Sequence, residues 1–382
     1  MTTAARPVAP GTVLDGKYRI GQSIGEGGMA QVFAAHNEQL DIDVAIKVLR
    51  PEHALDQKLV ARFVREARVA TRIESEHVAI VRDFGVCRDN GTPYIAFELL
   101  KGEDLGHMLA ATGPFPIPVG VDYMMQALEG VAAAHVQGIL HRDLKPTNIF
   151  RVHRIGKPAL IKVLDFGVAK AIKGREIARS ALTSTSTMVG SPLYMAPEQL
   201  RGSKHVDARA DIWALGVTLY ELLTGHPPFD APTLGALLSA VMEGAPVPPE
   251  RYRPDVPPGL AAVLLRCMQR DRDRRFQSVR ELATELAPFG TESALASRVE
   301  IDSVFTDETV RAGSDPDLMS AYPEALAGRS GAPARPQTHP APSPGAGVGT
   351  SAPRPVLIAL AALGVILVLS IAGAVGFFMA RR

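Results

Sequence analysis

The spacing of apolar residues changes near residue 100 of the chain. Before this position, short runs alternate between apolar and polar residues, which is typical of strands with one buried face. After it, apolar residues recur every three or four positions, which predicts amphipathic helices. These helices cover about residues 121–137, 211–223, 234–242, 259–269 and 278–287. The pattern predicts an α+β fold with a small β-rich lobe over about 18–100 and a larger helical lobe over about 101–288.

One predicted strand carries a lysine among apolar residues. In the strand over residues 44–49, alternation puts Lys47 on the same face as Ala45. The helix over residues 59–73 carries Glu66 within its apolar stripe. A charge on an apolar face needs a partner, so we expect Lys47 and Glu66 to form an ion pair. The alternative is that Glu66 extends to solvent.

The two strands that precede Lys47 are joined by a glycine-rich turn. The first strand begins near Tyr18, and the turn contains Gly25, Gly27 and Gly28. This arrangement predicts a β-hairpin. Glycines also allow backbone N–H groups to approach phosphate oxygens closely. On its own, the turn could belong to any hairpin.

Residues 141–148 contain several charged and polar side chains close together in sequence. They include the carboxylate of Asp143, the ammonium of Lys145 and the carboxamide of Asn148, and Asp165 follows as the start of an Asp-Phe-Gly triplet. A carboxylate that can accept a proton, together with two oxygen ligands for a hard metal ion, supplies the groups that phosphoryl transfer needs. The alternative is a solvated polar loop. A second Asp-Phe-Gly, at residues 83–85, is interpreted as a turn and a chance match.

Taken together, these motifs resemble the eukaryotic-like, Hanks-type serine/threonine protein kinases of bacteria. The resemblance covers residues 18–288 and includes Ala-Ile-Lys at 45–47, His-Arg-Asp at 141–143 and Ala-Pro-Glu at 196–198. It implies a two-lobed protein kinase fold. The implied reaction transfers the γ-phosphoryl group of ATP to Ser or Thr hydroxyls of proteins, with Mg²⁺ or Mn²⁺ as the metal. Lys145 is the residue that the serine/threonine class has at this position.

The resemblance also assigns a role to individual residues. Ala30 stands where the family has a third loop glycine, and its methyl group should stiffen the turn without abolishing binding. Phe97 would take the gatekeeper position, and residues 98–100 would form the hinge whose backbone meets the adenine edge of ATP. Glu198 would pair with Arg275, and Asp211 would hold the backbone of the catalytic loop, residues 141–148. Catalytic roles fall on Lys47, Glu66, Asp143, Lys145 and Asn148, and metal binding on Asn148 and Asp165. ATP contacts are assigned to Ile24, Gly25, Glu26, Gly27, Gly28, Met29, Ala30, Gln31, Val32, Ala45, Lys47, Glu98, Leu100 and Phe150.

A hydroxyl-rich stretch at residues 183–187 precedes the Ala-Pro-Glu motif and corresponds to an activation segment. Arg142, beside the expected base, is a cation without an assigned anion. We therefore expect phosphate on Thr183 or Thr185 to pair with Arg142 and to order the segment. The alternative is a flexible loop that is merely rich in hydroxyl groups.

The composition changes after the last predicted helix. Residues 289–354 are rich in Pro, Gly and Ala without periodicity, which predicts a disordered juxtamembrane linker. Residues 356–380 carry no charge and would form roughly 37 Å of helix, enough to cross a hydrocarbon core of about 30 Å. They predict a single transmembrane helix. ATP supply places the kinase domain in the cytoplasm, although Arg354, Arg381 and Arg382 mildly oppose this orientation.

Composition narrows the possible partners. The formal net charge is +1, which gives no argument for nucleic acid. Cys87 and Cys267 show no metal-ligand spacing and suit a reducing compartment. Residues 1–17 lack the apolar run of a signal peptide and predict a flexible arm.

Expected partners are protein substrates, the chain itself and membrane lipid. Thr306 and Thr309, among acidic residues, could form a docking site for a phosphothreonine reader, or simply a solvated acidic stretch.

Two other functions fit part of these observations. A catalytically inactive pseudokinase scaffold would have lost the lysine, the aspartate or the asparagine of the motifs, and all three are present. A kinase for small molecules is disfavoured by the Ala-Pro-Glu segment, which is typical of kinases that act on proteins.

Overall fold

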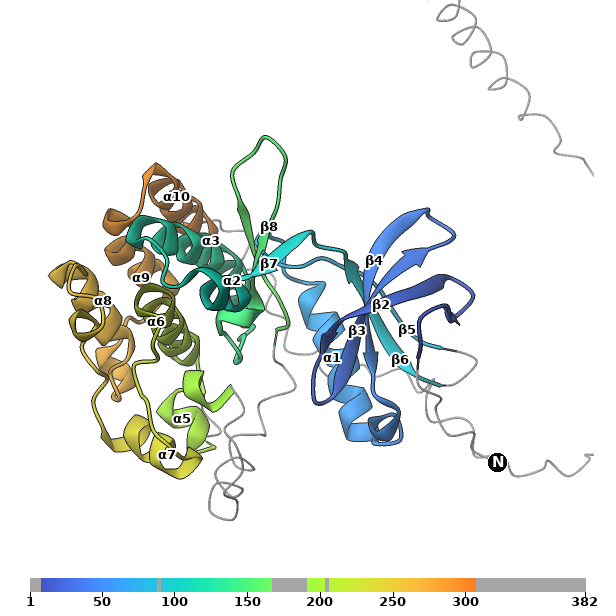
Figure 1. The fold of residues 1–382 in the computed structure, drawn as a ribbon, viewed down its shortest axis with the longest axis horizontal. Helices are drawn as coiled ribbons and strands as arrows, with labels where there is room; N and C mark the ends of the chain where they lie inside the picture. The colour runs from blue at the N-terminus through green and yellow to red at the C-terminus, as the bar shows by residue number, and fades with distance from the viewer. Residues whose placement is uncertain (1–7, 88–90, 167–190, 203–205, 307–382) are drawn as a thin grey trace, which may run out of the picture. The chain divides into compact units, whose positions relative to one another are not determined.

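The computed structural model describes residues 8–87, 91–166, 191–202 and 206–306. Over these ranges a β-rich lobe is followed along the chain by a helical lobe, as Figure 1 shows. The α+β class and the change of architecture near residue 100 are therefore confirmed.

The N-terminal lobe is a six-stranded antiparallel sheet with one helix, α1, over Gln57–Ala70. The strand order is β1-β2-β3-β4-β6-β5. The two faces of β4 belong to different cores: Ile46 packs with the outer face of the sheet, and Leu49 packs with Phe63 of α1. The strands are β1 Val13–Leu14, β2 Tyr18–Glu26, β3 Ala30–Asn37, β4 Ile42–Leu49, β5 Val81–Val86 and β6 Pro93–Glu98. The flexible arm predicted over residues 1–17 is wrong at β1, because Val13 and Leu14 pair with β2 and Leu14 is buried in the core of the sheet.

The second Asp-Phe-Gly lies inside strand β5, not in a turn. Its Asp83 accepts hydrogen bonds from Lys17 Nζ at 2.5 Å and from Tyr18 Oη at 2.7 Å, which ties the start of β2 to the sheet edge. Strand β5 begins at Val81. The backbone before it pairs with strand β9, Leu160–Val163, through a parallel bridge between Val78 and Val163.

The C-terminal lobe is built around α6, which is buried on nearly all sides as its all-round apolar sequence predicts. At Gly216 this helix approaches α8 so closely that a Cβ atom would lie 2.3 Å from Cys267 Cβ. This lobe also contains a short sheet of three strands, β7 Gly102–Asp104, β8 Ile149–Val152 and β9 Leu160–Val163. Strand β8 begins directly after Asn148, and β9 leads to Asp165. The helices are α2 Leu105–Thr112, α3 Ile117–His135, α5 Pro197–Leu200, α6 Arg209–Thr224, α7 Leu234–Glu243, α8 Pro258–Cys267, α9 Val279–Leu286 and α10 Glu292–Thr306.

Helix α10 corrects the predicted start of the linker at residue 289. It packs against α3 and α9 and buries Ala294, Ser297 and Ile301. The segment before it is fixed to α3, because the N–H and hydroxyl of Thr291 donate to the carboxylate of Asp122 at 2.8 and 2.6 Å. Two of the three buried positions are small residues, which suit a close helix contact but give no strong apolar stripe. Composition therefore failed to reveal this helix.

No helix in the described ranges is long and apolar enough to cross a membrane. The predicted span at 356–380 lies outside those ranges, as do most of the predicted linker and Thr309. Thr306, which we expected in the linker, is the last residue of α10.

Candidate active site

Lys47 on β4 lies between two carboxylates. Its Nζ atom is 2.6 Å from Glu66 Oε1 on α1 and 2.8 Å from Asp165 Oδ1. Burial alone would lower the pKa of Lys47, but Asp165 and Glu66 outweigh it and the pKa is raised. The ammonium is therefore charged at neutral pH. The predicted contact between Lys47 and Glu66 is confirmed, whereas the contact with Asp165 was not anticipated.

Helix α1 presents Glu66 inward because its start and its apolar stripe fix its rotation. Asp56 caps the helix by accepting the N–H groups of Lys58 and Leu59. Phe63 and Ala67, on the same stripe as Glu66, are buried against the sheet. Burial raises the pKa of the Glu66 carboxyl, and the ammonium of Lys47 opposes this.

The catalytic loop is held by the buried carboxylate of Asp211, at the start of α6. Asp211 accepts the backbone N–H groups of His141 and Arg142, both at 2.8 Å, as the resemblance implied. It also contacts His135 Nε2 at 2.8 Å, which sequence reasoning missed. Burial opposes ionisation of Asp211, but the hydrogen bond from His135 and its charge lower the pKa. The feature of the sequence that could have indicated this contact is the position of His135 on the apolar face of α3.

His141 connects the catalytic loop to the Asp-Phe-Gly segment. Its Nδ1 accepts the N–H of Asp143 at 3.2 Å, so Nε2 carries the proton and donates to the carbonyl of Leu164 at 2.9 Å. Burial lowers the pKa of His141, which keeps the ring neutral. The ring also packs on Phe166, with centroids 4.6 Å apart.

The carboxylate of Asp143 lies between an amide and a cation. Asn148 Nδ2 donates to the carbonyl of Asp143 at 2.7 Å and to its Oδ2 at 3.1 Å. Because both partners are acceptors, the Asn148 nitrogen must face them, and its Oδ1 is directed away. Lys145 Nζ is 3.5 Å from Asp143 Oδ2. The structure thus brings the three predicted catalytic-loop residues together.

Asp165 adopts φ +53, an uncommon conformation for a non-glycine residue. Burial alone would raise its pKa, but Lys47 lowers it, so the carboxylate is ionised. A backbone hydrogen bond of 2.9 Å from the Leu164 N–H to the Asn148 carbonyl ties the two segments together. The outward Oδ1 of Asn148 and the Asp165 carboxylate are hard oxygen donors, which fit Mg²⁺ or Mn²⁺.

Comparison with known proteins identifies the family. A family model described as the protein kinase domain matches residues 18–285. The chain belongs to the protein kinase family. The kinase domain is 39% identical over 272 residues to the serine/threonine-protein kinase pkn3 of Myxococcus xanthus, covering 71% of this chain and 49% of that protein. It is 37% identical over 275 residues to PknB of Mycolicibacterium smegmatis, covering 72% and 43%.

Solved structures support the same fold. The kinase domain of Mycobacterium tuberculosis PknI superposes with a TM-score of 0.57 at 28% identity, covering 74% of this chain and all of that one. The chain spans less than half the length of the two curated relatives. The two-lobed protein kinase fold is therefore established for the described residues.

The glycine-rich loop of this kinase is a closed turn. The Gly27 N–H donates to the carbonyl of Ala30 at 2.9 Å, and Arg50 Nε donates to the carbonyl of Gly27 at 3.0 Å. A Cβ atom at Gly28 would meet nothing within 4 Å, so this side of the turn is open. The Ala30 methyl group points into the core beside Leu49. The methyl group of Ala30, in place of the third glycine, is therefore buried in the core and does not narrow the open side of the turn at Gly28.

The other predicted ATP contacts are distributed around this loop. In the sheet, Val32 is paired with Lys47, and Ala45 is paired with Phe97. Strand β2 ends with Ile24, Gly25 and Glu26, and the turn after it contains Met29. Strand β3 contains Gln31 and Val32, and β4 contains Ala45 and Lys47. Strand β6 ends with Glu98, Leu100 lies just beyond it, and β8 contains Phe150. Their contacts with ATP stay predictions.

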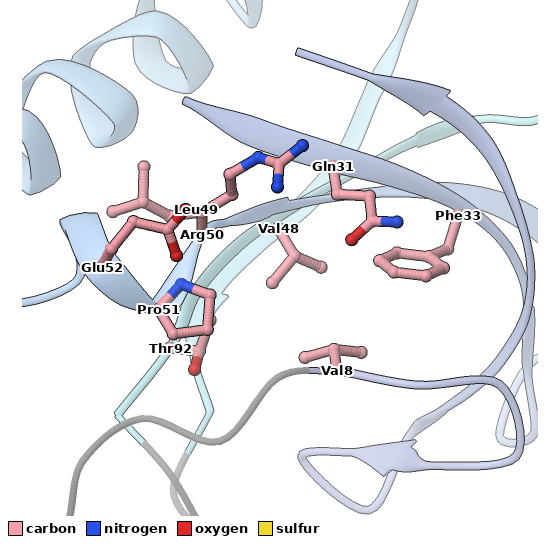
Figure 2. Close-up of a pocket in the computed structure, with 9 residues that line it drawn as sticks. All are labelled: Val8, Gln31, Phe33, Val48, Leu49, Arg50, Pro51, Glu52 and Thr92. Carbon is pink, nitrogen blue, oxygen red and sulfur yellow. The ribbon is translucent and has the colours of Figure 1, made fainter. Parts of the chain in front are cut away.

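A pocket of about 310 Å³ opens at the outer face of the N-terminal sheet (Figure 2). Its lining includes Phe33 and Val48 of the outer core, together with Leu49 of the core that contacts α1. Of the predicted ATP contacts, it includes only Gln31. This pocket is therefore separate from the kinase site.

The Ala-Pro-Glu motif is anchored as the family resemblance implied. Glu198 accepts two hydrogen bonds from Arg275, at 2.8 and 3.0 Å, and the guanidinium lies 5.0 Å from the ring centre of Trp213. The predicted phosphorylation sites Thr183 and Thr185 lie outside the described residues.

Proposed function

We propose that this chain is a serine/threonine protein kinase that transfers the γ-phosphoryl group of ATP to proteins. The observation that carries the proposal is the catalytic loop, in which Asn148 and Lys145 flank the carboxylate of Asp143. The charged Lys47, fixed by Glu66, supports the same reaction. The names of the relatives, serine/threonine-protein kinases, favour Ser and Thr as acceptors.

Each group has a defined task in the proposed reaction. Asp143 orients the substrate hydroxyl and accepts its proton as the new P–O bond forms, while the bond from the γ-phosphorus to the β,γ-bridging oxygen breaks and ADP leaves. Lys47 neutralises charge on the α- and β-phosphates, and Lys145 neutralises charge near the γ-phosphate. Asn148 and Asp165 would hold the metal ion. When bound, Mg²⁺ neutralises the phosphate charge that develops during transfer.

The proposal is tested with the full-length chain, Mg²⁺, ATP labelled on the γ-phosphate and a generic protein rich in Ser and Thr. We expect acid-stable label on Ser or Thr of the added protein and of the chain itself. If folded chain transfers no label to protein, the scaffold function would be favoured. Label found only on small molecules would contradict a protein substrate.

We further propose that the activation segment is autophosphorylated. The side chain of Arg142 has a buried Nε atom without a hydrogen-bond partner among the described residues. Burial lowers the pKa of its guanidinium; Asp211 opposes this, and the nearby cation Arg65 adds to it. Two neighbouring cations would be stabilised by a dianionic phosphate from Thr183 or Thr185.

Replacing Thr183 and Thr185 together by Ala is expected to lower transfer to added protein about 10-fold or more, because Arg142 then lacks its phosphate partner. Rates are measured after preincubation with ATP, and phosphate is mapped by mass spectrometry. Ser303→Ala, an exposed hydroxyl on α10, serves as the control. In an Arg142→Gln background the double Ala variant should cause no further loss. An unmodified segment in fully active protein would contradict the proposal.

We also propose that residues 356–380 anchor the enzyme in the cell membrane, with the kinase domain in the cytoplasm. The support is the uncharged run of residues, long enough to span the bilayer, together with the need for ATP.

Deleting residues 355–382 is expected to move the chain from the membrane pellet to the supernatant, because the apolar segment holds it in the bilayer. The measurement is the distribution after high-speed centrifugation and alkaline washing. Deletion of the same number of residues from the linker, 320–347, is the matched control and should leave the chain in the pellet. Release of the full-length chain by alkaline washing would be evidence against the anchor.

A further inference from the structure

A buried ion pair lies next to the hinge, residues 98–100, that joins the two lobes. Lys162 Nζ on β9 is 2.8 Å from Glu98 Oε1 at the end of β6. The two side chains are only 6% and 18% exposed. Lys162 also donates to the carbonyl of Val78 at 3.1 Å. Neither side chain has a part in the proposed phosphoryl transfer, so the pair needs another explanation.

Glu98 fixes a second segment as well as Lys162. Its Oε1 accepts the N–H of Ile80 at 2.8 Å, and its own N–H donates to the carbonyl of Ile80 at 3.0 Å. Both backbone groups of Ile80 are thus bound by one hinge residue. The rotation of the peptide at Glu98 is determined by these contacts, and with it the direction of the backbone that continues to Leu100.

The segment at Ile80 is itself fixed to β9. The N–H of Val163 donates to the carbonyl of His77 at 2.8 Å, and the N–H of Ala79 donates to the carbonyl of Val163 at 3.2 Å. Strand β9 continues directly to Asp165. The ion pair therefore joins the end of β6, the segment between α1 and β5, and the strand that leads to the proposed metal ligand.

The energetics favour a positioning role over a stabilising one. Removing two charges from water is costly, and replacing both partners by well-packed apolar residues often gives an equally stable protein. What an ion pair with several hydrogen bonds supplies instead is one defined geometry, because a shifted hinge would leave a buried charge unpaired. Position matters at Glu98 because the family resemblance implies that the adenine edge of ATP meets this backbone.

We propose that the Lys162–Glu98 pair is a positioning device for adenine. It holds the hinge backbone from Glu98 to Leu100 at the distance and orientation that adenine recognition needs. The inference rests on the proposed function, since it assumes that ATP binds at this hinge. It assigns to Lys162, which is not among the predicted ATP contacts, a part in the choice of nucleotide.

The test compares Lys162→Met with the wild type in the full-length chain. We expect KM for ATP to rise about 10-fold while kcat at saturating ATP changes less than about 3-fold. The preference for ATP over GTP should shrink by a similar factor, because only the adenine contacts are disturbed. A merely structural loss of folded protein would lower the rates with both nucleotides equally and leave KM unchanged.

Matched variants sharpen the comparison. Lys157→Met makes the same change at an exposed lysine between β8 and β9 and should leave KM and selectivity unchanged. Lys162→Arg should restore most of the ATP preference. The effects of Glu98→Gln and Lys162→Met should not add in the double variant, because both break one interaction.

Equilibrium binding of ATP and GTP, with Mg²⁺, gives a readout that does not depend on turnover. An inactive wild-type chain that still prefers ATP would contradict the proposed function but not this inference. If Lys162→Met does not fold, Glu98→Gln provides the same comparison. Wild-type affinity and selectivity in a folded variant at either position would overturn the proposal.

Discussion

Replacing Asp143 by Asn is expected to lower the rate of phosphoryl transfer by about 10²- to 10⁴-fold while ATP still binds. The side chain is largely buried between Asn148 and Lys145, and Asn is nearly the same shape. The variant keeps an oxygen acceptor but loses the negative charge that orients the substrate hydroxyl and takes its proton. The loss should therefore appear in kcat, with KM for ATP close to that of the wild type.

Initial rates with labelled ATP and an added protein substrate measure this effect. Asp230→Asn, the same change at an exposed carboxylate of the helical lobe, is the matched control and should retain full activity. Thermal unfolding of both variants shows that the fold is unchanged. Equal rates for the Asp143 variant and the wild type would remove this residue from its proposed role.

Replacing Asp211 by Ala is expected to destabilise the fold by about 3–5 kcal/mol, which is the usual cost of leaving buried partners unpaired. The carboxylate is 1% exposed and contacts the backbone N–H groups of His141 and Arg142 together with His135. Arg142 has φ +65, and its N–H bond to Asp211 helps to hold that conformation. Activity should fall with stability, because the same contacts position Asp143.

Thermal and urea unfolding measure this second effect, and Asp230→Ala is the matched control, with a change within about 0.5 kcal/mol. The pKa of Asp211 is lowered in the fold, so its contribution is present above the ordinary aspartate pKa. That contribution is lost as pH falls through the lowered value. The difference between wild type and variant should therefore shrink only in acid. A variant as stable as the wild type at neutral pH would contradict this account.

The local sequence predicted those features that depend on spacing along one element. Alternation in β4 and the stripe of α1 placed Lys47 and Glu66 on facing surfaces, and the need to pair a buried charge predicted their contact. The long helices follow from apolar periodicity for the same reason. Their boundaries differ by a few residues, as for the helix expected at 121–137 and observed at Ile117–His135.

Features that depend on tertiary contact were missed. The short strands β7 and β9 are three and four residues long, too short for alternation to be distinctive. The contact of Asp165 with Lys47 joins positions far apart in sequence, and no local pattern encodes it. No local pattern marked Lys162, because the carboxylate that pairs with it, Glu98, lies on another element.

Helix α10 affects how far the catalytic domain could travel from a membrane. If the predicted linker is flexible, its roughly 50 residues between Thr306 and the proposed span would have a root-mean-square length of about 39 Å. A tether that began at residue 289 would reach about 45 Å. Under the proposed membrane anchoring, the packing of α10 on α3 would keep the catalytic domain within a thinner layer above the lipid. It would thereby raise the effective concentration at which neighbouring anchored proteins meet the active site.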